Sequence, residues 1–199
     1  MNEKPILFNA EMVNAILSGR KTQTRRIMGN QPAGQDLEAV HVRHNDDFNF
    51  QWYGNLGESS YFPCPLGKPG DQLWVRETFG DCGVRLVYRA DSDDGAACIV
   101  KRWTPSIHMP RWASRINLLI TGVRVERLND ISEQDAISEG LECYVDDGVP
   151  YYGPFNNGDC RPDVVFRGLW DSIYGQKEGE NWQANPWVWV INFERMEAK

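Results

Sequence analysis

The feature that most constrains the fold of this chain is a series of short β-type runs that do not alternate regularly with helices. Residues 187–193 read Trp-Val-Trp-Val-Ile-Asn-Phe, a run of aromatic and β-branched residues typical of a buried strand. Further strands are expected at 5–8, 21–26, 72–77, 84–90 and 116–128. In the last of these, Gly122 indicates a bulge or bend. Because no regular βαβ order is present, the pattern predicts an α+β domain built on a small mixed β-barrel with flanking helices.

Three helices are predicted beside these strands. The first begins after Asn9 and ends at Gly19, residue types that favour the start and the end of a helix. The second runs from Ser132 to Gly140. The third is expected at 163–174 and carries an apolar stripe at helical spacing. We expect all of this stripe to lie in the core: Phe166, Leu169, Trp170 and Ile173.

Two polar segments, at about 28–68 and 142–162, interrupt the order of predicted elements. Both are rich in Gly, Asn and Pro and lack sustained periodicity, which is typical of long loops or insertions. Within the first, residues 48–53 favour one edge hairpin through Phe48, Phe50, Trp52 and Tyr53. At 199 residues the chain is expected to form a single domain, 1–199, that carries these two insertions.

Several function classes are excluded by composition. No run approaches the roughly 20 apolar residues that a membrane-spanning helix needs, so no membrane partner is expected. The first five residues, Met-Asn-Glu-Lys-Pro, lack the apolar core of a secretory signal. The five cysteines are odd in number and widely spaced, which favours reduced thiols and a cytoplasmic protein.

The charges are distributed unevenly along the chain. The net charge is −7, yet two windows, between Glu11 and Asp36 and between Asp94 and Glu126, contain nine of the 21 basic residues and no acid. A basic face or cleft on an acidic body would attract phosphate. The alternative is that these cations pair with acids from elsewhere in the fold, and the sequence leaves both open.

Residues 19–26 concentrate four cations and two hydroxyls: Arg20, Lys21, Arg25, Arg26, Thr22 and Thr24. Alternation on a strand would place Lys21 and Thr24 on opposite faces. A bend between the preceding helix and the strand would bring the Lys21 amine toward Thr24, and the site would then suit an anionic or carbonyl-bearing ligand.

A second basic segment, 101–115, interleaves cations with aromatic rings: Lys101, Arg102, Trp103, His108, Arg111, Trp112 and Arg115. Cations that hold phosphate beside rings that stack on bases are the combination used to bind single-stranded RNA. A packed loop with core tryptophans is the alternative. Arg76 on the preceding strand joins this group as a candidate ligand contact, and Glu77 is a second candidate carboxylate that a salt bridge would equally explain.

A metal site is a weaker hypothesis. His41, His44, Asp46 and Asp47 are residue types that bind metals, but their spacing is not diagnostic of any metal. The scattered cysteines add nothing to this set. We therefore expect no metal and no cofactor.

Three motifs in order resemble the ASCH domain, a family of the PUA-like superfamily of small β-barrels. They are Ser-Gly-Arg-Lys-Thr-x-Thr-x-Arg at 18–26, Pro-Gly-Asp-x-Leu-Trp-Val-Arg-Glu at 69–77, and Ile-Ser-Glu-x-Asp-Ala-x-x-Glu-Gly at 131–140. The resemblance covers roughly residues 5–27, 68–140 and 164–195. With segment 103–115, the chain is similar to the longer ASCH proteins of bacteria and their prophages.

The resemblance implies binding of RNA or of modified nucleosides. Small bacterial members include amidohydrolases that remove acetyl from N4-acetylcytidine with a Thr, a Lys and a Glu, which correspond here to Thr24, Lys21 and Glu139. The chain departs from those members by its two insertions and by Arg25, where they carry an apolar residue. Three functions stay open at this point: an amidohydrolase, a non-catalytic RNA-binding module and a ribonuclease.

Overall fold

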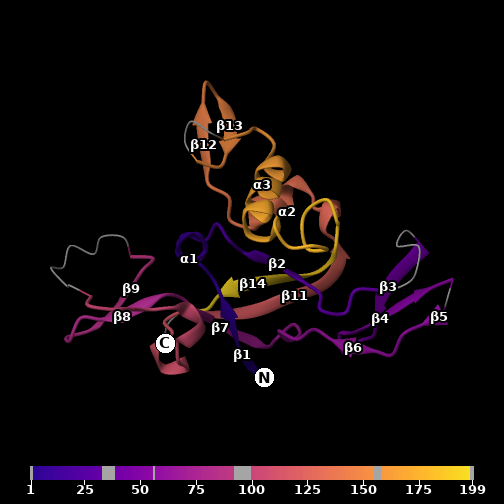
Figure 1. Cartoon of the computed structure of the whole chain (residues 1–199), viewed down its shortest axis with the longest axis horizontal. Coiled ribbons are helices and arrows are strands. Elements are labelled where there is room, and N and C mark those ends of the chain that lie inside the picture. The colour runs from indigo at the N-terminus through magenta and orange to yellow at the C-terminus, as the bar shows by residue number, and fades with distance from the viewer. Residues whose placement is uncertain (1, 33–38, 56, 92–99, 155–157, 198–199) are drawn as a thin grey trace.

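The computed structural model describes residues 2–32, 39–55, 57–91, 100–154 and 158–197. At its centre lies a mixed five-stranded sheet with the order β1-β7-β11-β14-β2 (Figure 1). Strand β1 runs parallel to β7, and the other neighbours are antiparallel. The bounds are β1 (Glu3–Leu7), β7 (Gln72–Arg76), β11 (Asn117–Arg127), β14 (Trp187–Arg195) and β2 (Gln23–Ile27). The predicted α+β class is confirmed.

The two outermost strands of this sheet approach each other through side chains. Arg26 of β2 donates a hydrogen bond from Nη2 to the carbonyl oxygen of Leu7 in β1 at 2.7 Å. Its guanidinium also lies 5.2 Å from the ring centre of Phe8, and that ring contacts Phe193 of β14. The sheet therefore curls back toward its first strand, as a small barrel requires.

Strand β14 is buried on both faces, which explains its continuous apolar sequence. Alternate residues Trp187, Trp189, Ile191 and Phe193 enter the main core, together with α1 and the first insertion. The intervening Val188 and Val190 enter a second core beneath α3. Opposite β14, the register of β11 shifts between Ile120 and Gly122, so the predicted bulge is present.

The three predicted helices are present as α1 (Ala10–Leu17), α2 (Glu133–Ser138) and α3 (Pro162–Tyr174). Asn9 caps α1 by accepting a hydrogen bond from the Met12 amide at 2.8 Å. Ser132 caps α2 in the same way, from the Asp135 amide at 3.1 Å. These side chains satisfy amides that the first turn of a helix leaves unpaired.

The first polar segment contains more structure than the one hairpin predicted. Strands β3 (Val40–His44), β4 (Asn49–Gly54), β5 (Gly57–Glu58) and β6 (Phe62–Pro63) form one sheet around β4. Its aromatic rings join the main core. The ring centre of Phe50 lies 4.9 Å from that of Trp189, and the ring centre of Trp52 lies 5.0 Å from that of Trp187. Burial of these rings fixes the segment to the central sheet.

The remaining strands form two small sheets. Strands β8 (Phe79–Asp81), β9 (Leu86–Tyr88) and β10 (Trp103–Thr104) pair in the order β10-β8-β9, so the strand expected at 84–90 is shorter than predicted. Strands β12 (Cys143–Asp146) and β13 (Val149–Tyr152) make a hairpin from the second polar segment, beside α3 (Figure 1). None of the helices in the described ranges is long and apolar enough to cross a membrane.

Candidate functional site

Lys21 lies in the short connection between α1 and β2. Its amide donates a hydrogen bond to the carbonyl oxygen of Ala15 at 2.9 Å, and its backbone forms an isolated bridge with Glu139 at the end of α2. The close approach depends on Gly140, whose φ is +97°. A Cβ at Gly140 would lie 2.7 Å from the Cβ of Lys21 and 2.9 Å from that of Ala15. Glycine at this position therefore allows α2 to reach the connection.

The Lys21 ammonium forms a buried ion pair with Glu139. Its Nζ donates to Oε2 of Glu139 at 2.8 Å and to the Glu139 carbonyl oxygen at 2.7 Å. The two residues are only 3% and 6% exposed. Burial lowers the pKa of Lys21 below its ordinary value, Glu139 opposes that change, and Arg26 and Arg25 add to it.

The amine retains one position for a further contact. An ammonium carries three N–H donors, and Glu139 accepts two of them. No described residue accepts a hydrogen bond from the third. If Lys21 is neutral, the same position holds the lone pair that receives a proton.

Lys21, Thr24 and Glu139 line one cavity of about 410 Å³, which we call the site cavity. Thr24 lies on β2, opposite Ile191 of β14. Because β2 begins at Gln23, Lys21 lies outside the strand, and the alternation of faces does not separate it from Thr24. The expected bend between helix and strand therefore brings both residues to the same cavity.

Helix α3 forms an apolar wall of the site cavity. The wall consists of Phe166, Leu169, Trp170, Ile173 and Tyr174, and Phe8 contributes a further ring. Phe166 and Trp170 are buried, as predicted, but Ile173 is 45% exposed. The prediction that the whole stripe is core was wrong for Ile173, because this face of α3 borders a cavity along part of its length.

Other polar groups of the site cavity were not identified from the sequence. Asn9, Thr78, Arg89 and Ser106 line it from segments that are distant in the chain. The Arg89 guanidinium lies 5.3 Å from the ring centre of Trp103. No spacing pattern links these residues, so the sequence contained no signal for them.

Arg25 also lines the site cavity, but its side chain is fully buried and bound to carboxylates. Its Nη1 donates to Glu139 at 3.2 Å. Its Nη2 contacts Glu126 and lies 3.5 Å from Asp135. The predicted ligand contact is thus part of an internal ion network.

The two basic windows do not form a free cationic surface. Six of their nine cations make an ion pair with a described carboxylate: Arg20, Lys21, Arg25, Arg111, Arg115 and Arg124. Arg20 lies 3.6 Å from Glu142 and borders a neighbouring cavity rather than the site cavity. The alternative that these cations pair with distant acids therefore describes most of them.

The arginines expected to hold phosphate around segment 101–115 bind the protein instead. Arg76 donates to the carbonyl oxygens of Met109, at 3.1 Å, and Ile107. Arg111 pairs with Glu3 and donates to Asn117 at 2.9 Å. These hydrogen bonds anchor the loop to the central sheet, so neither guanidinium is placed as a free phosphate contact.

Arg115 binds two carboxylates, each through two hydrogen bonds. Its Nε and Nη2 donate to the Glu77 carboxylate at 2.9 and 3.1 Å. Its Nη1 and Nη2 each donate to the Asp91 carboxylate at 2.8 Å. Burial raises the pKa of Glu77, whereas Arg115 opposes that rise. Glu77 lines neither the site cavity nor its neighbour, and its salt bridge accounts for it.

The other members of segment 101–115 differ in exposure. Lys101 and Arg102 are exposed, and Trp103 is half-buried in β10. Trp112 is 74% exposed. Of the residues predicted to stack on bases or hold phosphate here, these exposed ones keep side chains available to a partner.

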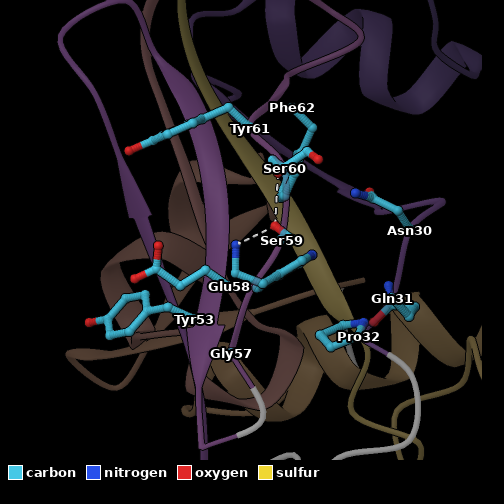
Figure 2. A pocket seen from close by; sticks show the side chains of 11 residues that line it. Asn30, Gln31, Pro32, Tyr53, Gly57, Glu58, Ser59, Ser60, Tyr61 and Phe62 are labelled. Atoms are coloured by element: carbon cyan, nitrogen blue, oxygen red, sulfur yellow. Dashed lines mark hydrogen bonds between the residues drawn. The ribbon is translucent and has the colours of Figure 1, made fainter.

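A second cavity of about 490 Å³ lies on the first polar segment (Figure 2). Figure 2 shows Tyr53, Glu58 and Tyr61 among its lining residues. The histidines proposed for metal, His41 and His44, belong to β3 of the same sheet and contact aromatic rings. No cluster of three or more metal-binding side chains occurs in the part of the chain that the structure describes.

Comparison with known proteins gives one distant structural similarity. The chain matches no protein-family model and no curated protein sequence. It is similar to the high-resolution crystal structure of an ASCH domain from Lactobacillus crispatus JV V101. The sequences are 14% identical, the TM-score is 0.38, and the alignment covers 98% of this chain and 79% of that domain. At this distance we transfer neither residues nor activity from that domain.

Proposed function

We propose that this chain is an ASCH-type protein that binds a cytidine-type nucleoside, free or within RNA, and hydrolyses an acyl amide on its base. One observation carries the proposal: Lys21, Thr24 and Glu139, remote in sequence, line the same cavity of about 410 Å³. They are also the three residues that the motifs at 18–26 and 131–140 single out.

The walls of the site cavity suit a flat, polar ligand. Phe8, Phe166 and Trp170 line the cavity with buried aromatic rings, and the half-buried Tyr174 beside them offers a ring on which a base can stack. Arg26 and Arg89 line the same cavity and supply positive charge for a ribose phosphate or for a developing oxyanion. A ligand that combines an aromatic ring with a carbonyl therefore fits both kinds of wall.

The proposed reaction requires Lys21 in its neutral form. The Thr24 hydroxyl attacks the acyl carbon, and its proton passes to the Lys21 amine. The resulting ammonium returns the proton to the departing nitrogen of the base, so that the C–N bond breaks and an acyl-threonine forms. Water then hydrolyses this ester to a carboxylic acid and restores the hydroxyl.

Glu139 holds the amine during these steps. Its carbonyl and Oε2 accept two N–H groups of Lys21, which directs the remaining position of the nitrogen away from them. The carboxylate also stabilises the ammonium that forms when Thr24 loses its proton. Burial has the opposite effect on the pKa, and this balance lets the amine take up and release a proton.

The test is incubation with N4-acetylcytidine, with cytidine and acetate measured by chromatography. Wild type should release both products, whereas Thr24→Val and Lys21→Met should lose on the order of 100-fold or more in rate. Thr24→Ser keeps the hydroxyl and should retain measurable turnover. Equal rates in wild type and Thr24→Val would contradict the proposal.

A non-catalytic RNA-binding module is the second candidate. The observation that favours it is the tight Lys21–Glu139 pair, which can serve solely to join the end of α2 to the connection before β2. In that case Thr24→Val should retain salt-sensitive affinity for a short labelled RNA. Replacing the exposed Lys101 and Arg102 with Gln should weaken it, and shortening of the RNA would indicate a ribonuclease instead.

A further inference from the structure

Arg25 lines the site cavity, yet its guanidinium is held by the protein. Its side chain has no exposed surface, and it contacts three carboxylates from three places in the chain: Glu126, Asp135 and Glu139. Glu126 belongs to β11, Asp135 to α2, and Glu139 follows α2. A buried cation is stabilised only where such partners surround it.

The outer carboxylates of this network are held by a second arginine. Arg124 donates from Nε to Glu126 at 3.0 Å and from Nη2 to Asp135 at 2.9 Å. With Lys21, the network contains three cations and three carboxylates, so its formal charges balance. Glu139 lies between Arg25 and Lys21, with Oε1 bound to the first and Oε2 to the second.

We propose that Arg25 is a positioning residue for Lys21: it fixes Glu139 so that one oxygen faces the amine, and it shares the charge of that carboxylate. The inference rests on the proposed function only for its catalytic consequence. The positive charge of Arg25, held against the same carboxylate, repels the Lys21 ammonium and offsets part of its attraction to Glu139. Arg25 therefore makes the proton of Lys21 easier to release.

The sign of the effect follows from the charges. When Arg25 is removed, the network gains one net negative charge, so Lys21 holds its proton more tightly and its pKa rises. When a carboxylate beyond Arg25 is neutralised, the network loses one negative charge. Arg25 then acts more strongly on Glu139, and the pKa of Lys21 falls.

Among the described residues, the charged groups that act on Lys21 are Glu139 after α2 and Arg25 and Arg26 of β2. The Phe8 ring lies 5.7 Å from Nζ, and α1 contributes the Ala15 carbonyl to the Lys21 amide. Helix α3 contributes aromatic side chains to the site cavity. Within the part of the chain that the structure describes, Arg25 is thus one of two cations that influence this amine.

The test is a titration of Lys21 by NMR of ¹³C-labelled lysine side chains, with the signal assigned by its loss in Lys21→Met. Arg25→Met should move the midpoint to higher pH than in wild type. Glu126→Gln should move it to lower pH, and because the Glu126 side chain is 18% exposed this change is the milder one. If Arg25→Met does not fold, Glu126→Gln alone decides the sign.

Opposite shifts in the two variants would support the proposal, whereas unchanged midpoints or shifts in the same direction would overturn it. If Arg25 had only a structural role, the two variants would not shift the Lys21 midpoint in opposite directions. Arg25→Lys keeps the positive charge but lacks the paired N–H groups of a guanidinium. Its midpoint should therefore lie closer to that of wild type than the midpoint of Arg25→Met does. The titration needs no substrate, so it gives its answer even if N4-acetylcytidine is not hydrolysed and the proposed function fails.

If deacetylation is observed, its pH profile should follow the same order. The rising limb, which reports loss of the Lys21 proton, should move to higher pH in Arg25→Met and to lower pH in Glu126→Gln. Loss of the Glu139 anchor should also lower the maximal rate in Arg25→Met and Arg25→Lys, because small displacements of catalytic groups cost up to about 100-fold. A rate that falls without movement of the limb would contradict the charge-sharing role.

Discussion

Replacing Glu139 with Gln should lower the stability of the protein, because it leaves the buried Lys21 without its charged partner. The Lys21 Nζ is held by two hydrogen bonds, of which the one to the Glu139 backbone carbonyl survives and the one to Oε2 loses its charged partner. Breaking a buried ion pair by removing one partner costs about 3–5 kcal/mol. The surviving carbonyl contact and the amide oxygen of Gln place the expected loss near the lower end, at about 3 kcal/mol. For a chain of this size, that loss corresponds to a decrease in Tm of roughly 6–12 °C.

The variant should also change how stability depends on pH. Without the carboxylate, burial lowers the pKa of Lys21 further, because the main opposing influence is gone. The folded state then releases a proton that the unfolded chain keeps until about pH 10.4, so the free energy of unfolding rises as pH increases through the folded pKa. In wild type this rise begins at higher pH.

Urea denaturation between neutral and alkaline pH measures both effects. Glu180→Gln is the matched control, because its pair with Lys177, at 3.3 Å, is exposed and should contribute at most about 1 kcal/mol. The reasoning is refuted if Glu139→Gln is no more damaging than this control. It is also refuted if the loss is the same at every pH.

Three further predictions concern one glycine at the site and two buried groups elsewhere in the fold. Gly140→Ala should lower the free energy of unfolding by about 2–3 kcal/mol, because the new Cβ would lie 2.7 Å from the Cβ of Lys21 at a positive φ. The control Gly148→Ala also has a positive φ but meets no neighbouring atom within 4 Å, so it should lose only about 1 kcal/mol in the same urea denaturation. Arg115→Met should lower the free energy of unfolding by about 3–5 kcal/mol at neutral pH, because it leaves the buried Glu77 carboxylate unpaired. The loss should shrink at lower pH as Glu77 takes up a proton, and a loss that does not change with pH would contradict this. Burial raises the pKa of the Cys64 thiol, so native protein should alkylate there more slowly than at its exposed thiols by mass spectrometry, and equal rates would count against the burial.

The local elements of the fold were readable from the sequence because local chemistry fixes them. Asn9 and Ser132 begin helices in the structure because their side chains each reach an unpaired amide three residues later. The continuous apolar run of β14 indicated a buried strand, and the structure shows that cores on both of its faces bury it. The bulge near Gly122 followed from a glycine inside a β-branched strand.

Partners that are remote in sequence could not be predicted in the same way. The basic segments around Arg25 and Arg111 gave no sign of which acids they meet, because those acids lie about a hundred residues away. Their apparent positive charge is mostly cancelled on folding. The amphipathic spacing of α3 likewise identified an apolar face, but spacing cannot distinguish a face that meets core from one that borders a cavity, as at Ile173.

The convergence of Lys21, Thr24 and Glu139 came from the motif resemblance rather than from spacing. The residues themselves indicated only that a bend could bring Lys21 toward Thr24. The structure adds Gly140, which permits the approach of α2, and the α3 wall that encloses the cavity. The chemistry of the site therefore depends on packing between elements that no short window of sequence contains.

The most direct test of the account is a binding map. Amide and side-chain NMR signals of Thr24→Val should be recorded while N4-acetylcytidine is added, because this variant should bind the nucleoside without consuming it. We predict that the largest shifts fall on Lys21, Glu139 and the indole of Trp170. Shifts confined to Tyr53 and Tyr61 at the second cavity, or no shifts at all, would contradict it.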